Sequence, residues 1–151
     1  MRIIYLHQYF VTPDMAGGTR SFEMARRLVH AGHEVHVVTT WSKPTEKRGW
    51  YETDESGIRV HWLPVPYSNA MSYRDRIIAF MQFAFSSASK AASLNGDVIF
   101  ASSTPLTIAL PGIYASLWKR IPMVFEVRDL WPELPIVVGA CRFFCLKRRF
   151  R

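Results

Sequence analysis

The chain has 151 residues, of which 49% are hydrophobic and 21% are charged, and this composition excludes a disordered or fibrous protein. Such a length suits one domain, which can bury about 68–70% of its unfolded surface in a single core. The formal net charge is +7, but residues 141–151 hold five Lys and Arg side chains and no acid, so residues 1–140 carry only +2. Because the body of the chain is only mildly basic, we expect no nucleic-acid partner.

Cysteine usage and the first residues bear on the compartment. Cys141 and Cys145 are the only cysteines, and their spacing suits neither a CxxC redox pair nor a four-ligand zinc site. We therefore expect reduced thiols, no metal centre and a cytoplasmic location. The first apolar stretch is interrupted by His7 and Gln8 and lacks a small-residue cleavage site, so it is predicted to be a strand rather than a signal peptide.

The beginning of the chain has the pattern of a strand, a loop and a helix. An apolar run predicts a strand over residues 2–7, and apolar side chains at helical spacing predict a helix over residues 19–31. Glu23 is placed to pair with Arg27 four positions later. Gly32 follows the helix directly, where glycine is the usual residue.

The middle of the chain adds two strands and a long helix. Val-rich and apolar runs predict strands over residues 34–40 and 58–63. Residues 41–57 are charged and aperiodic, which predicts an exposed loop. The sequence from Ser72 to Asp75 is similar to a capping box that opens a helix ending near Leu94.

The last predicted elements follow the same alternation. A strand is predicted over residues 97–101, and Thr104-Pro105 has the residue types of an N-cap followed by the first helical position. Pro111-Gly112 is expected to kink or restart that helix, and a further strand is predicted over residues 122–127.

Short apolar strands that alternate with helices predict an α/β fold with a Rossmann-like, doubly wound, mostly parallel sheet. In such sheets, ligands bind outside the carboxyl ends of the strands, near the point where the strand order reverses. Three segments with polar or glycine residues are expected at this edge: His7 with the Gly17-Gly18 loop, residues 102–104, and Arg128-Asp129.

The Gly17-Gly18 loop has the features of an anion site. A helix start leaves free backbone N–H groups and a partial positive charge, and glycine lets a phosphate approach without a clash against Cβ. An ordinary loop between a strand and a helix would look the same, so both interpretations stay open.

Glu126 interrupts an apolar strand, where a carboxylate needs a partner. Alternation places Glu126 and Arg128 on one side of the strand and Asp129 on the other. One interpretation is a structural ion pair between Glu126 and Arg128, and the other is a ligand contact. His7 is likewise either a ligand contact or a core histidine.

Residues 77–89 contain no charged side chain and several aromatic ones. Thirteen residues are fewer than the ~20 that span a bilayer. The segment is predicted to be part of a core helix or, with Arg74 and Arg76 beside it, an interfacial element at a membrane.

Four segments stand in a characteristic order: residues 4–10 (IYLHQYF), 17–20 (GGTR), 32–35 (GHEV) and 126–133 (EVRDLWPE). Their order and spacing resemble the amino-terminal domain of family 4 glycosyltransferases over residues 1 to about 140, and most closely its WbuB-like, or fucosamine-transferase-like, branch.

This resemblance implies a GT-B enzyme, in which two Rossmann-like domains face a cleft. Residues 1–140 would be the acceptor-binding domain, and residues 141–151 a divergent basic tail of a truncated or frameshifted product. The carboxyl-terminal donor-binding domain is absent from the sequence, so we expect little activity from the chain alone. The implied reaction is transfer of a sugar, with retention of configuration, in bacterial surface polysaccharide biosynthesis.

The resemblance also implies the ligands. The donor would be a nucleotide sugar and the acceptor a lipid-linked saccharide at the cytoplasmic face of the inner membrane, with no cofactor and no obligatory metal. An alternative is a non-catalytic domain that binds a phosphorylated ligand or a membrane. A dinucleotide oxidoreductase is disfavoured, because the first loop lacks GxGxxG and Thr39-Thr40-Trp41 stands where an acidic residue would follow the second strand.

Residue roles follow from the same resemblance. Gly17 and Gly18 correspond to the glycine loop that lies against the donor diphosphate. Arg128 stands where many members of the family have a histidine; because arginine cannot act as a general base near neutral pH, it is expected to stabilise charge. Asp129 becomes the candidate for deprotonating the acceptor. The expected acceptor contacts are His7, Thr19, Arg20, Glu126 and Glu133.

Overall fold

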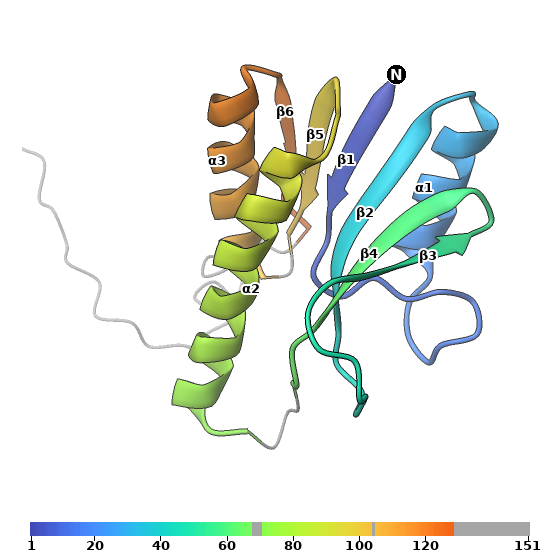
Figure 1. Cartoon of the computed structure of the whole chain (residues 1–151). Helices are drawn as coiled ribbons and strands as arrows, with labels where there is room; N and C mark the ends of the chain where they lie inside the picture. Colours follow the sequence, from blue (N-terminus) through green and yellow to red (C-terminus); the bar gives the residue numbers. More distant parts are fainter. Residues whose placement is uncertain (68–70, 104, 129–151) are drawn as a thin grey trace, which may run out of the picture.

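The structure, a computed structural model, describes residues 1–67, 71–103 and 105–128. These residues form a six-stranded sheet in the order β3-β4-β2-β1-β5-β6, which Figure 1 shows as one twisted layer. The strands are β1 (Arg2–Leu6), β2 (Glu34–Trp41), β3 (Tyr51–Glu55), β4 (Ile58–Pro64), β5 (Val98–Ser102) and β6 (Met123–Glu126).

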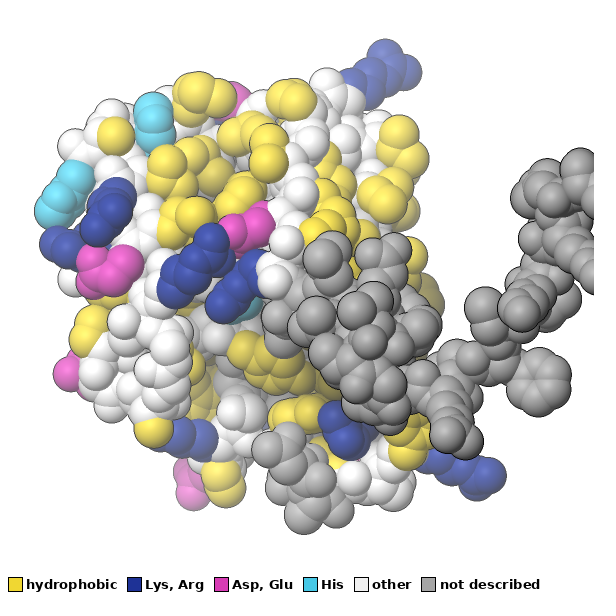
Figure 2. Space-filling view, turned by 180° about the vertical axis from the view of Figure 1, so that it is seen from behind, with side chains coloured by type: hydrophobic (Ala, Val, Ile, Leu, Met, Phe, Trp, Pro, Cys, Tyr) yellow, Lys and Arg dark blue, Asp and Glu magenta, His cyan; other side chains and the backbone are white. Residues whose placement is uncertain are grey.

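Helices cover both faces of the sheet. Helix α1 (Arg20–His30) packs behind β2 and β4 in the view of Figure 1, while α2 (Tyr73–Ser93) and α3 (Ala109–Lys119) pack on the front. A short 3₁₀ helix, η1 (Leu106–Ile108), precedes α3. Figure 2 shows the molecule from behind, where Lys and Arg side chains gather beside acidic ones. The predicted doubly wound α/β fold is therefore confirmed.

Strand β1 lies in the middle of the sheet and pairs in parallel with both β2 and β5. From β1 the chain first builds β2 and β4 on one side and later β5 and β6 on the other. The strand order thus reverses between β1 and β5, and the carboxyl ends of five parallel strands lie along one edge, at the bottom of Figure 1. This is the edge at which ligands bind in doubly wound sheets.

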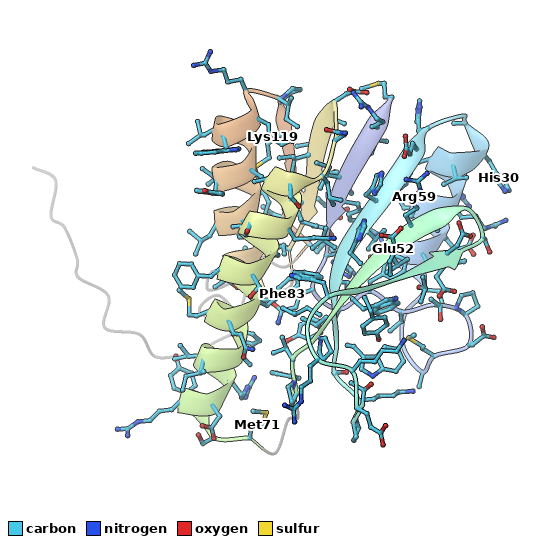
Figure 3. All side chains as sticks on the ribbon, viewed as in Figure 1. His30, Glu52, Arg59, Met71, Phe83 and Lys119 are labelled. Atoms are coloured by element: carbon cyan, nitrogen blue, oxygen red, sulfur yellow. The ribbon has the colours of Figure 1, made fainter. Side chains whose placement is uncertain are left out.

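The core has two halves because successive side chains of a strand point to opposite faces. On β1, Ile4 and Leu6 pack with α2 and α3, and Tyr5 packs with residues of α1. Phe83 of α2 points toward the sheet (Figure 3) and is fully buried. The Val-rich strand β2 is buried on both faces from Val35 to Thr40, which explains its continuous apolar run.

One element was not predicted. Strand β3 lies inside residues 41–57, which the sequence pattern assigned to an exposed loop, and it pairs antiparallel with β4 at the edge of the sheet. Its side chains alternate between half-buried, as at Tyr51 and Thr53, and exposed, as at Glu52 and Asp54. Charged side chains are common on edge strands. In β3 they interrupt the alternation of apolar and polar residues by which a strand is recognised in a sequence.

Local predictions were confirmed at two helix ends and wrong at two other points. The Ser72 hydroxyl accepts from the Asp75 N–H at the start of α2, and Gly32 follows α1 with φ +82°. Glu23, however, pairs with Arg26 at 2.7 Å rather than with Arg27.

The expected kink at Pro111-Gly112 is the second wrong prediction, because α3 runs without interruption through both residues. Pro111 is the third residue of α3, and in the first turn its missing N–H breaks no helical hydrogen bond. Pro105 precedes η1 instead of occupying a first helical position, and Thr104 lies outside the described residues.

Helix α2 buries one part of its apolar stretch in the core and leaves another part exposed. Ala79, Phe83 and Ala84 are buried in the core, whereas Phe85 is 71% exposed and Ile78 is 63% exposed. Among the helices of the described residues, none has the length and apolar character needed to cross a bilayer.

Candidate functional site

Polar groups from β1, β5 and β6 meet at the carboxyl edge of the sheet. The imidazole Nδ1 of His7, directly after β1, lies 3.4 Å from the carbonyl oxygen of Ser102 at the end of β5. The Ser102 hydroxyl donates to Glu126 Oε2 of β6 at 2.6 Å. This chain of contacts crosses the point where the strand order reverses, and we call these residues, with Ser103, Arg128 and Arg20, the carboxyl-edge site.

His7 is buried and electrically neutral. Removal from water and, to a smaller extent, the positive charge of Arg128 lower the pKa of His7 to about 4, although the contact with the Ser102 carbonyl acts in the opposite direction. With a carbonyl as its neighbour, Nδ1 must carry the proton and donate, which leaves Nε2 as a hydrogen-bond acceptor. His7 can therefore accept a hydrogen bond from a ligand hydroxyl at neutral pH.

Glu126 forms an ion pair with Arg20, the first residue of α1. Arg20 Nη1 lies 3.2 Å from Glu126 Oε2, and Nη2 contacts Oε1. The hydrogen bonds from Arg20, followed by the one from Ser102, hold the pKa of the Glu126 carboxyl below its usual value. Of the two interpretations of Glu126, the ion pair with Arg128 is wrong, because the ion-pair partner is Arg20, 106 residues away in the sequence. Alternation along one strand does not detect such a partner.

Arg128 is anchored to the same site through its backbone. Its N–H donates to the Ser103 hydroxyl at 2.7 Å, and the Ser103 N–H donates to the Glu126 carbonyl at 2.8 Å. The exposed Arg128 side chain forms no ion pair with another described residue. A guanidinium that pairs with no described acid, beside a paired one, is suited to bind a carboxylate or phosphate.

The glycine loop leads directly into this site. Gly17 has φ +143°, and a Cβ there would lie 3.3 Å from a Val11 methyl group, so the backbone conformation and the space both favour glycine. Gly18 faces open space, since a Cβ there would meet no described atom within 4 Å. Thr19 is the N-cap of α1 but makes no side-chain cap hydrogen bond, which leaves N–H groups at the helix start available to an anion.

Tyr5 is a component of the site that sequence reasoning missed. Its side chain is fully buried close to Arg20 and Glu126, and burial raises the pKa of the phenol while the neighbouring hydroxyls of Ser21 and Ser102 lower it. The one available signal was a phenol within the apolar run of β1, since a buried tyrosine hydroxyl usually has polar neighbours.

The structure thus brings together the predicted residues His7, Arg20, Glu126 and Arg128, with the glycine loop at the start of α1. Asp129 and Glu133 lie outside the described residues, as do the two cysteines. Within the described ranges, no group of three or more His, Cys, Asp or Glu side chains is arranged to hold a metal ion.

The fold and the position of this site define the class of protein: a Rossmann-like α/β domain with a ligand-binding edge at the reversal of strand order. Residues 16–150 match the glycosyl transferase 4-like domain, and the chain belongs to this family. Family membership indicates a transferase. No curated protein matches the sequence.

Solved structures share the fold. The C-terminal domain of PF1911 hydrogenase from Pyrococcus furiosus aligns with a TM-score of 0.59 at 15% identity, covering 83% of this chain and 91% of that one. The E. coli trehalose-6-phosphate structure with bound UDP-2-fluoro glucose aligns with a TM-score of 0.52 at 17% identity, covering 83% of this chain but only 32% of that chain. At these identities the likeness extends to the fold alone, and it agrees with one half of a GT-B enzyme.

Proposed function

We propose that residues 1–140 are the acceptor-binding domain of a retaining glycosyltransferase of the WbuB-like branch. The enzyme transfers a sugar from a nucleotide sugar to a lipid-linked saccharide in the biosynthesis of bacterial surface polysaccharide such as O-antigen. The observation that carries this proposal is the convergence of His7, Glu126 and Arg20 at the reversal of strand order, in a chain of the glycosyl transferase 4-like family.

The domain supplies half of an active site in this proposal. The chain spans 32% of the E. coli structure that contains a sugar nucleotide analogue, and in the proposed enzyme the donor would be held by a second domain. The chain alone is expected to bind its acceptor but to transfer sugar slowly or not at all.

The donor diphosphate is assigned to the start of α1. Gly17 and Gly18 let the phosphate approach the backbone, and the uncapped helix start supplies N–H donors and a partial positive charge. These interactions strengthen as negative charge builds on the departing diphosphate, which is when they accelerate the reaction.

The acceptor is assigned to the carboxyl-edge site. His7 Nε2 accepts a hydrogen bond from a sugar hydroxyl, while Arg128 stabilises negative charge. Glu126 is already bound by Arg20 and Ser102, so it orients ligands instead of taking a proton. That leaves Asp129 as the proposed proton acceptor, with Thr19 and Glu133 as further acceptor contacts.

The outer surface of α2 and α3 supports a peripheral membrane contact. Leu110, Ile113, Tyr114, Leu117 and Trp118 recur at helical spacing on α3, and all are exposed. An apolar groove of about 370 Å³ lies between α3 and α2. We call this surface the α2–α3 face.

Charge favours an anionic lipid surface as the partner of the α2–α3 face. Arg74, Arg76, Lys119 and Arg120 flank it, and Asp75 is the one acidic residue within the two helices. Apolar and aromatic side chains with a basic rim are typical of proteins that rest on anionic lipid. A contact of this kind at the cytoplasmic face of the inner membrane would hold the domain near a lipid-linked acceptor.

The exposed α2–α3 face is also compatible with the second candidate function, that of a non-catalytic domain that binds membranes or phosphorylated ligands. The two candidate functions differ in whether ligand binding requires a sugar on the ligand. Calorimetry of the chain with a short prenyl diphosphate, with and without an attached saccharide, should give at least tenfold tighter binding of the glycosylated compound. Equal affinity for both compounds would favour the second candidate.

Substitutions test whether the glycosylated prenyl diphosphate binds at the carboxyl-edge site and whether the α2–α3 face contacts the membrane. Arg128→Ala should weaken binding of the glycosylated prenyl diphosphate, whereas Arg27→Ala, an exposed arginine on α1, should leave it unchanged. In liposome flotation, Leu117→Glu should reduce binding to vesicles containing anionic lipid, and the control Thr45→Glu in the loop before β3 should not. Unchanged flotation of Leu117→Glu would reject the proposed membrane contact.

A further inference from the structure

A second cleft opens at the carboxyl end of β2, beside the carboxyl-edge site. It has a volume of about 450 Å³, and its walls include the aromatic rings of Trp41 and Tyr51. Polar side chains around it come from two loops and a strand: Asp14, Lys43 and Glu55. We call it the aromatic cleft.

The aromatic side chains of the cleft, Trp41 and Tyr51, pack against the buried ring of Trp62, which holds them in place. The Trp41 and Trp62 ring centroids are 5.4 Å apart with perpendicular planes, and Tyr51 stacks on Trp62 at 6.5 Å. Trp62 is itself buried, and its indole N–H donates to the Thr53 hydroxyl at 2.8 Å. Trp41 and Tyr51 remain half-exposed, so they present fixed apolar surfaces at low entropic cost on binding.

One polar atom in this wall is unexplained by the fold. The indole N–H of Trp41 is buried and has no hydrogen-bond partner among the described residues. Buried donors of this kind are rare in folded proteins, because each one loses its hydrogen bond to water. Because this nitrogen is shielded from solvent, only the rest of the half-exposed Trp41 ring is open to a ligand.

The cleft and the carboxyl-edge site share one edge of the sheet. The N–H and hydroxyl of Thr40, next to Trp41, both donate to the Gln8 carbonyl, at 3.2 and 2.7 Å, which ties the end of β2 to the residue after His7. Asp14 lies in the loop that continues to Gly17. Figure 1 shows the loop between β1 and α1 and the loop between β2 and β3 leaving the same lower edge of the sheet.

We infer that the aromatic cleft is a saccharide subsite that binds a sugar ring of the acceptor beyond the ring that reacts. The inference rests on the proposed function in that the acceptor is an oligosaccharide. The flat apolar face of a pyranose would stack on Trp41, because Trp62 and Lys47 already contact the Tyr51 ring. The sugar hydroxyls would donate to the carboxylates of Asp14 and Glu55.

The charges of the cleft argue for a neutral sugar over a phosphorylated ligand. Lys43 and Lys47 are balanced by Asp14 and Glu55, and the Lys47 ammonium already lies 4.0 Å from the centroid of the Tyr51 ring. A phosphate would meet two carboxylates here, whereas hydroxyl groups can donate to carboxylates and accept from lysines.

The test measures binding of chitin oligosaccharides of increasing length to the chain by calorimetry and saturation-transfer NMR. Affinity should rise when a second or third ring is added, by about tenfold. Trp41→Ala should abolish this gain and leave single-sugar binding unchanged. Trp118→Ala, which removes a 70% exposed tryptophan from α3, is the matched control and should behave like the wild type.

Glu55→Gln provides a variant that keeps the fold and should lower oligosaccharide affinity about threefold by removing one acceptor. If Trp41→Ala and Glu55→Gln both bind oligosaccharides as well as the wild type while His7→Ala loses binding, the subsite is rejected and the proposed function stands. Competition at Trp41 by a nucleotide, but not by oligosaccharides, would also reject the subsite. If the wild-type chain binds no saccharide of any length, both are rejected.

Discussion

Buried histidines lie beside carboxylates at two places in the sheet, and the two places differ in how many polar contacts each imidazole makes. Near the middle of β2 and β4, His36 Nδ1 lies 3.1 Å from His61 Nε2, and His36 Nε2 lies 3.1 Å from Glu34. His61 Nδ1 is 3.2 Å from Glu52. Every ring nitrogen of this pair thus lies beside a polar atom of another side chain.

Glu34 also pairs with Arg59 at 3.2 Å, and Figure 3 labels Glu52 and Arg59 on the β2–β4–β3 side of the sheet. At the carboxyl-edge site, by contrast, His7 uses one ring nitrogen and Arg128 pairs with no described acid. We therefore infer a structural role for the histidines that contact one another inside the sheet, and a ligand-binding role for the one at its carboxyl edge.

The largest effect that sharpens this comparison is the pH dependence of stability, to which both clusters contribute. The folded-state pKa is about 4 for His7 and about 3 for His61, both lowered by burial. Below a pH of about 6.5 the unfolded state takes up protons that the native state does not, so stability decreases as the pH falls. Between pH 7 and 5 we expect a loss on the order of 2 kcal/mol per histidine.

Urea unfolding at pH 7, 6 and 5 measures this loss. Each single variant, His7→Ala or His61→Ala, should have a shallower dependence on pH than the wild type. The control His33→Ala, on the turn between α1 and β2, should keep the full dependence. A wild-type free energy of unfolding that does not change between pH 7 and 5 would contradict the assignment of both histidines as neutral.

His61→Ala should be the most damaging of the single-histidine changes for stability at pH 7. It leaves His36 Nδ1 without a partner and opens a space in the core, so we expect the free energy of unfolding to fall by about 1–3 kcal/mol. Denaturant titration gives this number. Binding of saccharide to the correctly folded variant should stay at the wild-type level, and a loss of binding would show that the two clusters are not separate.

His7→Ala should have the opposite profile. Acceptor affinity should fall about tenfold, equivalent to ~1.4 kcal/mol, because the hydrogen-bond acceptor Nε2 is lost. His7→Gln keeps a side chain with an acceptor of similar reach and should recover part of the affinity. Calorimetry with the glycosylated prenyl diphosphate measures both variants, and wild-type affinity in His7→Ala would exclude His7 from the site.

The smallest effect on stability is expected for Arg20→Ala. The Arg20 side chain is 50% exposed, so loss of its pair with Glu126 should change the free energy of unfolding by less than ~1 kcal/mol, and less still at high salt. Thermal unfolding at low and high salt tests this. A loss several times larger would mean that the pair holds α1 to the sheet and that Arg20 is not available to a ligand.

Most helices and strands could be predicted from the sequence, because buried positions recur along it with the regular spacing of a helix or a strand. The Val-rich run of β2, the helical spacing of α1 and the Ser72 cap of α2 each predicted an element that the structure contains. Strand β3 was missed because a charged edge strand satisfies its pairing through the backbone, and its side chains need not be apolar.

The site was only partly predictable because its contacts join distant parts of the chain. The position of His7 after β1 and the glycine loop before α1 followed from topology. The pairing of Arg20 with Glu126 did not, since it depends on how close the start of α1 lies to the end of β6. The aromatic cleft is assembled from the loop after β1, the end of β2 and the β3 hairpin, and no local pattern marks such an assembly.

The central claim is that the carboxyl-edge site binds the acceptor, and NMR of the isotope-labelled chain tests it most directly. Titration with a glycosylated prenyl diphosphate should shift the backbone signals of His7, residues 17–20, residues 102–103 and residues 126–128. Signals of His36 and His61 should stay in place. Shifts confined to the β2–β4 histidines, or to the α2–α3 face, would contradict the account.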